Sequence, residues 1–261
     1  MAQVRFGPGG FGMPTDKGIE YVSSLGLSAA EIEFTYGVNM SNETAKKIGE
    51  LAKKHKIFLS IHAPYYINLA SEDKQKIGAS KTRILQSCER GHYLGAKYVV
   101  FHAAFYGKMP KEECYEQVKK EILEMQAHIK QKKWDVELAP ETTGKASQFG
   151  DLDELLRLAK ETHCYLCIDF AHLKARYNGK IDYKEIFDKI KKSGINHIQA
   201  HFSGIEFTAK GERRHIVTEE SDLKELLQWI KKSGLDTTII NESPDPIKDS
   251  LKGLNIYQKL N

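Results

Sequence analysis

The stretch Cys164-Tyr-Leu-Cys-Ile-Asp-Phe-Ala-His172 is a short apolar run that ends in a carboxylate, with an imidazole three residues later. Such a run is typical of a buried strand. Asp169 would then lie at the C-terminal tip of the strand, and His172 in the first turn of the following loop. Carboxylate and imidazole are both metal ligands. The stretch also fits an ordinary strand followed by a helix cap, so its meaning depends on repetition elsewhere in the chain.

Similar apolar runs recur along the whole chain, and we expect each of them to form a strand. The predicted strands are residues 4–7, 31–34, 57–62, 98–102, 136–141, 164–169, 197–201 and 237–242. Between them, apolar residues recur at the three- and four-residue spacing of amphipathic helices. The predicted helices are residues 16–25, 41–55, 72–94, 111–132, 152–162, 183–193, 222–233 and 246–260.

Eight strand–helix units in a chain of 261 residues predict the α/β fold called a TIM (β/α)8 barrel, which runs to about 250 residues. We expect one domain over residues 1–261. A doubly wound sheet is the alternative, and it would want a Gly-rich phosphate loop after the first strand. The stretch Phe6-Gly-Pro-Gly-Gly-Phe11 is Gly-rich but lacks the fingerprint spacing.

Composition and charge indicate an ordinary globular protein. The formal net charge is +4, which permits an anionic partner without requiring one. No apolar stretch approaches the roughly 20 residues that span a membrane, and residues 1–14 lack the apolar segment of a signal peptide. We therefore expect a cytoplasmic protein without membrane contact, and a monomer.

The pair Cys164 and Cys167 has the spacing of some zinc and redox motifs, but we interpret it as structural. Residues three apart in a strand point to opposite faces, and a redox pair needs a helix N-terminus to lower its thiol pKa. Buried, reduced thiols fit better, and the same holds for Cys88 and Cys114.

Metal-ligand residue types gather at the C-terminal ends of six consecutive predicted strands. In barrels of this kind, catalytic groups come from these strand ends and the loops after them. The residues there are His62, His102, Glu141, Asp169 with His172, His201 and Glu242, and His215 follows in the loop after the seventh strand. The remaining histidines, to which we assign no role, are His55, His92, His128, His163 and His197.

This set predicts a site with more than one metal ion, because a single divalent ion needs about four to six ligands. A mixture of imidazole and carboxylate suits Zn²⁺, in two or three ions, or Mn²⁺ where carboxylates predominate. Two ions about 3.5–4 Å apart can hold both oxygens of a phosphoryl displacement. Glu141 lies between the other tips in chain order, and we expect it to be the bridging, catalytic ligand.

At these residues the sequence resembles the endonuclease IV family of apurinic/apyrimidinic (AP) endonucleases, from about residue 57 to 244. The motifs are Ile61-His-Ala-Pro-Tyr-Tyr-Ile-Asn-Leu69, Phe101-His102, Pro140-Glu-Thr-Thr-Gly-Lys-Ala-Ser-Gln-Phe-Gly150, Cys167-Ile-Asp-Phe-Ala-His172, His201-Phe-Ser and Asn241-Glu-Ser-Pro244. The resemblance implies a TIM barrel with a trinuclear zinc site. It also implies DNA repair activity, in which double-stranded DNA is cut 5′ to an abasic site to leave a 3′-hydroxyl. The ligand roles fall on the eight residues named above.

One position departs from the family. An Asp two residues before the last His is the ninth ligand there, and this chain has Arg213, with Glu212 one residue off. Three alternatives follow: Glu212 reaches the ion beside His215, that ion is weak or absent, or the activity has changed. We expect Arg213 to turn outward toward DNA phosphates.

Two other functions remain open. Sugar isomerases and epimerases of the same barrel superfamily look similar at Glu141, Asp169, His201 and Glu242, and use one metal. A barrel that binds nucleic acid or a phosphorylated ligand without cutting it is the third interpretation.

Substrate contacts are expected from two loops. Tyr65, Tyr66 and Asn68 follow His62 and could line a pocket for the extruded abasic nucleotide, or the tyrosines could simply cover the barrel mouth. Ser147, Gln148 and Gly150 precede a predicted helix, whose N-terminus could hold a phosphate. An ordinary helix cap is the alternative there.

Overall fold

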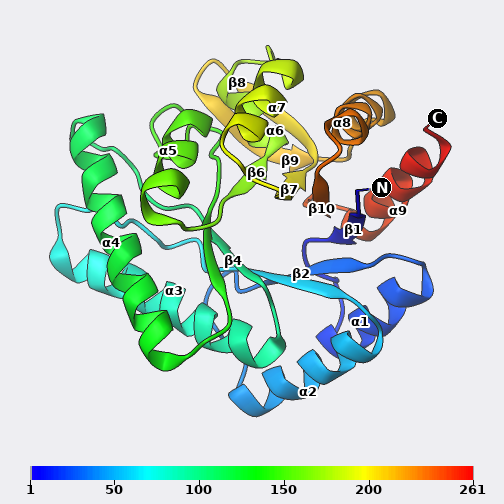
Figure 1. Ribbon diagram of the computed structural model, residues 1–261, viewed down its shortest axis with the longest axis horizontal. Helices are drawn as coiled ribbons and strands as arrows, with labels where there is room; N and C mark the ends of the chain where they lie inside the picture. The colour runs from blue at the N-terminus through cyan, green and yellow to red at the C-terminus, as the bar shows by residue number, and fades with distance from the viewer. Residues whose placement is uncertain (1, 261) are drawn as a thin grey trace.

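The computed structural model describes residues 2–260, and its central feature is a ring of parallel strands surrounded by helices (Figure 1). Met1 and Asn261 of the predicted domain lie outside the described residues. The barrel strands are β1 (Val4–Pro8), β2 (Ala29–Glu33), β3 (Phe58–His62), β4 (Tyr98–Phe101), β5 (Glu137–Pro140), β6 (Cys167–Asp169), β7 (His197–Phe202) and β10 (Asp236–Asn241).

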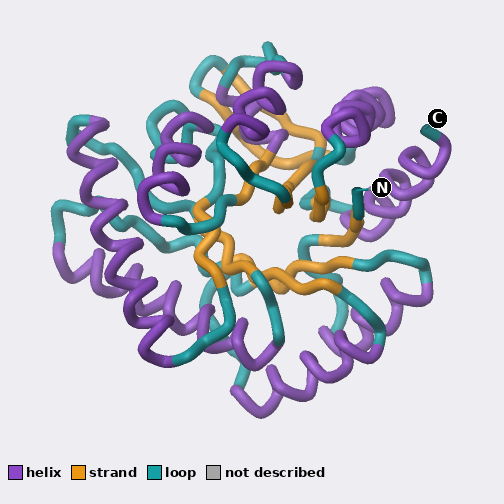
Figure 2. Tube along the Cα trace, in the orientation of Figure 1, coloured by secondary structure: helices purple, strands orange, loops and turns teal. Residues whose placement is uncertain are grey.

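The helices alternate with these strands and pack on the outside of the ring (Figure 2). They are α1 (Thr15–Ser24), α2 (Asn42–Lys54), α3 (Lys74–Leu94), α4 (Lys111–Lys132), α5 (Leu152–Thr162), α6 (Phe170–Arg176), α7 (Tyr183–Lys192), α8 (Glu220–Ser233) and α9 (Pro246–Lys259). Their buried apolar faces, such as Leu155 and Leu158 of α5, form the core against the strands.

Two four-stranded parallel sheets, β2-β3-β4-β5 and β1-β10-β7-β6, close into the barrel. Parallel bridges join them, one between Gly9 and Glu31 and one between Glu141 and Cys167. Gly7 permits the first junction, because a Cβ there would lie 1.8 Å from the carbonyl oxygen of Ala29. The α/β barrel predicted from the sequence is therefore confirmed.

The segment after β6 differs from the loop that the sequence predicted around His172. His172 does not lie in a loop but in helix α6, which begins directly after Asp169. The Asp169 carboxylate accepts a hydrogen bond of 2.7 Å from the backbone N–H of His172 and so caps the helix. Burial of Phe170 and Leu173 against the barrel stabilises this short helix.

The segment after β7 corrects a second expectation. It forms an antiparallel hairpin of β8 (Gly204–Thr208) and β9 (Gly211–Ile216), where the sequence predicted a loop. The pairing register shifts between Glu206 and Phe207, so that Arg213 and Arg214 together face one residue of the partner strand. This is a β-bulge, which re-aims the side chains beyond it.

Candidate metal centre

The eight predicted ligand residues converge at the C-terminal end of the barrel. His62 and Asp169 are the last residues of β3 and β6, and His201 lies in β7. Of the other strand-tip residues, His102, Glu141 and Glu242 each follow their strand by one position. The remaining two come from the segments that the sequence did not predict, His172 from α6 and His215 from β9.

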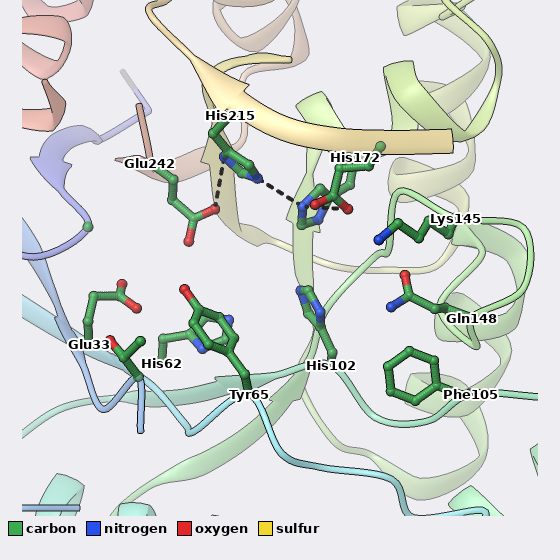
Figure 3. Close-up of a pocket in the computed structure, with 13 residues that line it drawn as sticks. Glu33, His62, Tyr65, His102, Phe105, Lys145, Gln148, His172, His215 and Glu242 are labelled. Carbon is green, nitrogen blue, oxygen red and sulfur yellow. Dashed lines mark hydrogen bonds and ion pairs between the residues drawn. The ribbon is translucent and has the colours of Figure 1, made fainter. Parts of the chain in front are cut away.

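Five of these residues, His62, His102, His172, His215 and Glu242, line a cavity of about 520 Å³ (Figure 3). Its walls are Gly9, Glu33, Thr35, His62, Tyr65, His102, Phe105, Lys145, Gln148, His172, Glu212, His215 and Glu242. Glu141, Asp169 and His201 are buried, and each contacts a residue that lines the cavity. The cavity therefore combines imidazole, carboxylate, aromatic and cationic groups.

Glu141 occupies the centre of the group. Its Oε2 lies 3.2 Å from Nε2 of His62 and 3.0 Å from Nε2 of His102. Its Oε1 lies 3.2 Å from Nδ1 of His172 and 3.3 Å from Nδ1 of His201. Burial raises the pKa of the Glu141 carboxyl, but the surrounding histidines outweigh it and hold the pKa well below its usual range.

Four overlapping groups bring ligand atoms within 4.8 Å of one another, and three of them contain histidine. The three with histidine are His62, His102 and Glu141; then Glu141, Asp169, His201 and Glu242; then Asp169, His172 and His215. The fourth consists of carboxylates alone, Glu31, Glu33 and Glu242. Oε1 of Glu141, Oδ2 of Asp169 and Nδ1 of His201 are buried and have no hydrogen-bond partner among the described residues. Unsatisfied buried donors and acceptors of these types fit divalent metal ions, which suggests metal binding.

The charges of the cavity depend on one another. Burial lowers the pKa of His62, but the carboxylates of Glu141, Glu33 and Glu31 reverse this effect and raise it to about 10. Burial raises the pKa of Glu33 to about 8, and the charges of Glu31 and Glu242 add to this shift. The carboxylates of the cavity thus repel one another and attract cations.

The bulge in β9 determines which groups of the hairpin face the cavity. Residues three apart in a regular strand point to opposite faces, but the extra residue lets both Glu212 and His215 reach the cavity wall. Oε2 of Glu212 lies 3.5 Å from Nε2 of His172. Arg213 points outward, with 63% of its side chain exposed, and pairs with Glu206 at 2.8 Å.

The substrate residues expected from the sequence divide into two sets. Tyr65 and Gln148 line the cavity. Asn68 does not; its side-chain oxygen accepts hydrogen bonds from the backbone N–H groups of Ala70 and Phe105 and so ties two loops together. Ser147 and Arg213 are also not among the residues that line the cavity.

Four residues that the sequence did not indicate stand in or beside the cavity. Phe105 and Lys145 come from the loops after β4 and β5 and line the wall opposite Glu33 (Figure 3). Glu33 and Glu31 lie in β2, and Glu31 is fully buried. The available signal was a pair of acidic residues, two apart, in a strand that is otherwise apolar.

Of the histidines to which we assigned no role, His197 has the most contacts. It lies at the start of β7, where its Nδ1 is 3.0 Å from the Tyr98 hydroxyl and its Nε2 is 3.0 Å from Oγ1 of Thr238. This position is at the N-terminal end of the barrel, away from the cavity.

The strands and the ligand-bearing end define a TIM-barrel protein with metal-capable groups at the C-terminal face. A family model described as xylose isomerase-like TIM barrel matches residues 19–260, and the chain belongs to this family.

Two relatives show how far the sequence similarity extends. The uncharacterized protein MJ0133 of Methanocaldococcus jannaschii is 37% identical over 254 residues, which cover 94% of this chain and 92% of the relative. A protein named probable endonuclease 4, from Mycoplasmopsis synoviae, is 33% identical over 138 residues, 51% of this chain and 47% of that relative. The match to this second protein thus spans about half of its length.

Solved structures share the fold at low sequence identity. Endonuclease IV from Thermus thermophilus aligns with a TM-score of 0.75 and 20% identity over 97% of both chains. A D-tagatose 3-epimerase-like protein aligns with a TM-score of 0.74 and 19% identity, over 98% of this chain and 96% of that one. These matches show the fold alone, and together with the relatives they support the resemblance to the endonuclease IV family.

No helix within residues 2–260 combines the length and apolar character needed to cross a membrane.

Proposed function

We propose that this chain is a metal-dependent hydrolase that cuts the DNA phosphodiester bond 5′ to an abasic site and leaves a 3′-hydroxyl. One observation carries the proposal. Besides the group of Glu141, Asp169, His201 and Glu242, four further histidines line the cavity and form two more ligand groups that contain histidine. A single-metal enzyme would not need these four additional histidines as ligands. The names of the endonuclease 4 relatives point to the same reaction.

We assign ligand roles to the eight predicted residues, with Glu141 as the bridging carboxylate. Glu212 joins them in place of the carboxylate that the family has at position 213, because it reaches the cavity beside His172. Imidazole predominates in the first and third groups, which suits Zn²⁺, and carboxylate predominates in the second, where Mn²⁺ also fits. When bound, such ions activate a water molecule and stabilise negative charge on a phosphoryl group.

The chain itself contributes fixed positions and tautomers. Nδ1 of His62 is 2.8 Å from the carbonyl oxygen of Ala63, and Nδ1 of His172 is 2.9 Å from that of Thr142. Donation of an N–H to these carbonyls leaves Nε2 of each ring without a proton. This atom lies 3.2 Å from Oε2 of Glu141 in His62 and 3.1 Å from Nε2 of His215 in His172. The histidines are therefore preorganised, and no ring has to rotate when the substrate arrives.

Recognition of the DNA would combine charge and shape. Lys145 reaches into the cavity from the loop after β5, where its ammonium group could contact a phosphate (Figure 3). Tyr65 and Phe105 offer exposed rings at the mouth, and 55% of Tyr65 and 44% of Phe105 are accessible. An abasic nucleotide loses no stacked base when it is extruded, so entry into this pocket is energetically cheap.

The test is cleavage of a duplex with one tetrahydrofuran abasic analogue, by protein loaded with Zn²⁺. We expect a single cut 5′ to the analogue, with a 3′-end that a polymerase can extend. His62→Ala combined with His102→Ala should abolish cutting, because the first ligand group is removed. The exposed pair Lys184→Ala and Asp188→Ala on α7 is the matched control and should cut normally.

A single-metal sugar epimerase is the second candidate, favoured by the group of Glu141, Asp169, His201 and Glu242 and by the epimerase-like structural match. In such an enzyme a pair of carboxylates moves a proton next to a carbonyl. Turnover of a ketose by the same preparation, with the abasic duplex left intact, would replace our proposal with this one.

A further inference from the structure

The fully buried Glu31 has no part in the predicted ligand set, yet it contacts one of its members. Oε1 of Glu31 lies at ion-pair distance, 2.9 Å, from Nε2 of His201, and both residues are 0% exposed. Neither of these two atoms has a hydrogen-bond partner among the described residues. On the other side of the same ring, Nδ1 of His201 faces Oε1 of Glu141 at 3.3 Å and Oε1 of Glu242 at 3.2 Å. The imidazole therefore stands between the candidate ion group and a carboxylate beneath it.

Glu31 is itself held in place by a buried chain of hydrogen bonds. The Ser60 hydroxyl donates to Oε2 of Glu31 at 2.5 Å, and the Gln199 side-chain amide donates to the Ser60 oxygen at 3.1 Å. Ser60 lies in β3 and Gln199 in β7, and both are 0% exposed. Three strands thus fix this carboxylate, which leaves its second oxygen directed at His201.

Three of the other cavity histidines have an uncharged oxygen as the nearest partner of Nδ1. It is the carbonyl of Ala63 for His62 at 2.8 Å, the carbonyl of Thr142 for His172 at 2.9 Å, and the hydroxyl of Ser203 for His215 at 2.8 Å. For His172 the Glu141 carboxylate also lies 3.2 Å from Nδ1. A carboxylate partner makes the imidazole a stronger ligand than a neutral partner does, because it stabilises the positive charge that the ring gains on binding a cation.

We infer that Glu31 is a positioning residue that fixes His201 with its proton on Nε2, so that Nδ1 is free to bind the ion shared with Glu141, Asp169 and Glu242. The inference rests on the proposed function, because it takes His201 as a ligand. Its consequence is selective. Loss of the Glu31 charge should weaken one ion and leave the ion beside His62 and His102 in place.

The experiment measures how many zinc ions per chain resist a graded series of chelator concentrations, by elemental analysis after desalting. For Glu31→Leu we expect the affinity of one ion to fall about 10- to 100-fold, the usual effect of removing an outer partner of a metal-binding histidine. Glu31→Gln should show a smaller loss, since its amide oxygen can still face Nε2 of His201 but carries no charge.

Two further variants serve as the negative and the positive control. Glu121→Gln removes another buried glutamate, whose partner is Lys81 at 2.6 Å on the outer helices, and it should retain every ion. His201→Ala should lose the same ion as Glu31→Leu. Far-ultraviolet circular dichroism of the metal-free proteins checks that all the variants are folded, and Glu31→Gln replaces Glu31→Leu should the latter fail this check.

Wild-type zinc affinity in both Glu31→Leu and Glu31→Gln, with an ion lost from His201→Ala, would overturn the role of Glu31 and leave the proposed function intact. Equal weakening of every ion in the Glu31 variants would also overturn it. If His201→Ala itself kept all its ions, the ligand assignment would fall, and this inference with it.

Discussion

Glu212 and His172 meet across the cavity, with Oε2 of the carboxylate 3.5 Å from Nε2 of the imidazole. The contact exists because β9 bulges at Arg213. The backbone of the loop after β5 approaches Glu212 closely at Gly144, where a Cβ would lie 2.6 Å from the Cβ of Glu212. The hairpin can therefore close onto the loop after β5 only where that loop has a glycine.

Glu212→Ala should reduce the zinc content by one ion per chain relative to wild type. The reason is that the Glu212 carboxylate lies beside His172 and lines the cavity together with His215, where it can complete the third ligand group. Elemental analysis after dialysis against a weak chelator measures the change. Glu206→Ala on the same hairpin, which pairs with Arg213 and Arg214 on the outer side, is the control and should keep all its ions. Full zinc content in Glu212→Ala would exclude Glu212 as a ligand.

Arg213→Ala should weaken binding to abasic duplex without any change in metal content. Its guanidinium lies on the exposed side of the hairpin, where it can contact a phosphate. The slope of log affinity against log salt should decrease by about 1, as expected for one lost phosphate contact. Fluorescence anisotropy over a salt series makes the measurement. An unchanged slope would mean that Arg213 only pairs with Glu206.

The loop after β5 depends on one buried cation. Arg176 of α6, whose side chain is 4% exposed, donates hydrogen bonds to the carbonyl oxygens of Thr143, Lys145 and Gln148. Arg176→Met should lower the free energy of unfolding by about 3 kcal/mol, since it leaves buried carbonyls without donors. It should also raise KM, because Lys145 and Gln148 line the cavity.

Chemical denaturation and cleavage kinetics measure these two effects of Arg176→Met. Arg157→Met removes an arginine whose side chain is 42% exposed and should cost less than about 1 kcal/mol, as exposed pairs do. Equal losses in the two variants would show that Arg176 has no special role in the loop.

The stability of the protein should depend on pH through His197, which lies at the N-terminal end of the barrel. Burial, with a smaller contribution from Arg5, lowers its pKa from 6.5 to about 4. The folded state thus favours the neutral ring, so the stability contribution is complete above pH 6.5 and is lost as the pH falls toward 4.

Thermal unfolding of metal-free protein between about pH 7 and about pH 4.5 tests this behaviour, since the window spans most of the range between the two pKa values. The melting temperature of wild type should fall more steeply than that of His197→Asn, although the variant starts lower because it loses its contacts with Tyr98 and Thr238. His163→Asn at the end of α5 should follow wild type. Parallel curves for wild type and His197→Asn would contradict the proposed titration.

The barrel and the gathering of its tip residues could be predicted because both follow from local patterns. Apolar runs define the strands, and parallel strands end at one face, so His62, Asp169 and His201 had to converge. Helix α6 was missed because seven residues give little periodicity, and its cap, Asp169, read equally well as a strand end.

The rest of the site depends on tertiary contacts. The bulge that brings Glu212 inward arises from the pairing of β8 with β9, and a one-residue shift leaves no mark in the sequence. Glu31 was missed for another reason. Glu31 does not end its strand, so the strand-end pattern does not include it, although its side chain contacts His201 and Ser60 inside the barrel.

The number of metal ions bound to the purified chain tests the central claim most directly. Protein reloaded with Zn²⁺ and freed of excess should contain two or three ions, as the three ligand groups that contain histidine predict. The count should fall in the variant that combines His62→Ala with His102→Ala. A single ion per chain that this variant retains would contradict a polynuclear centre, and would assign the site to the one-metal chemistry of Glu141, Asp169, His201 and Glu242.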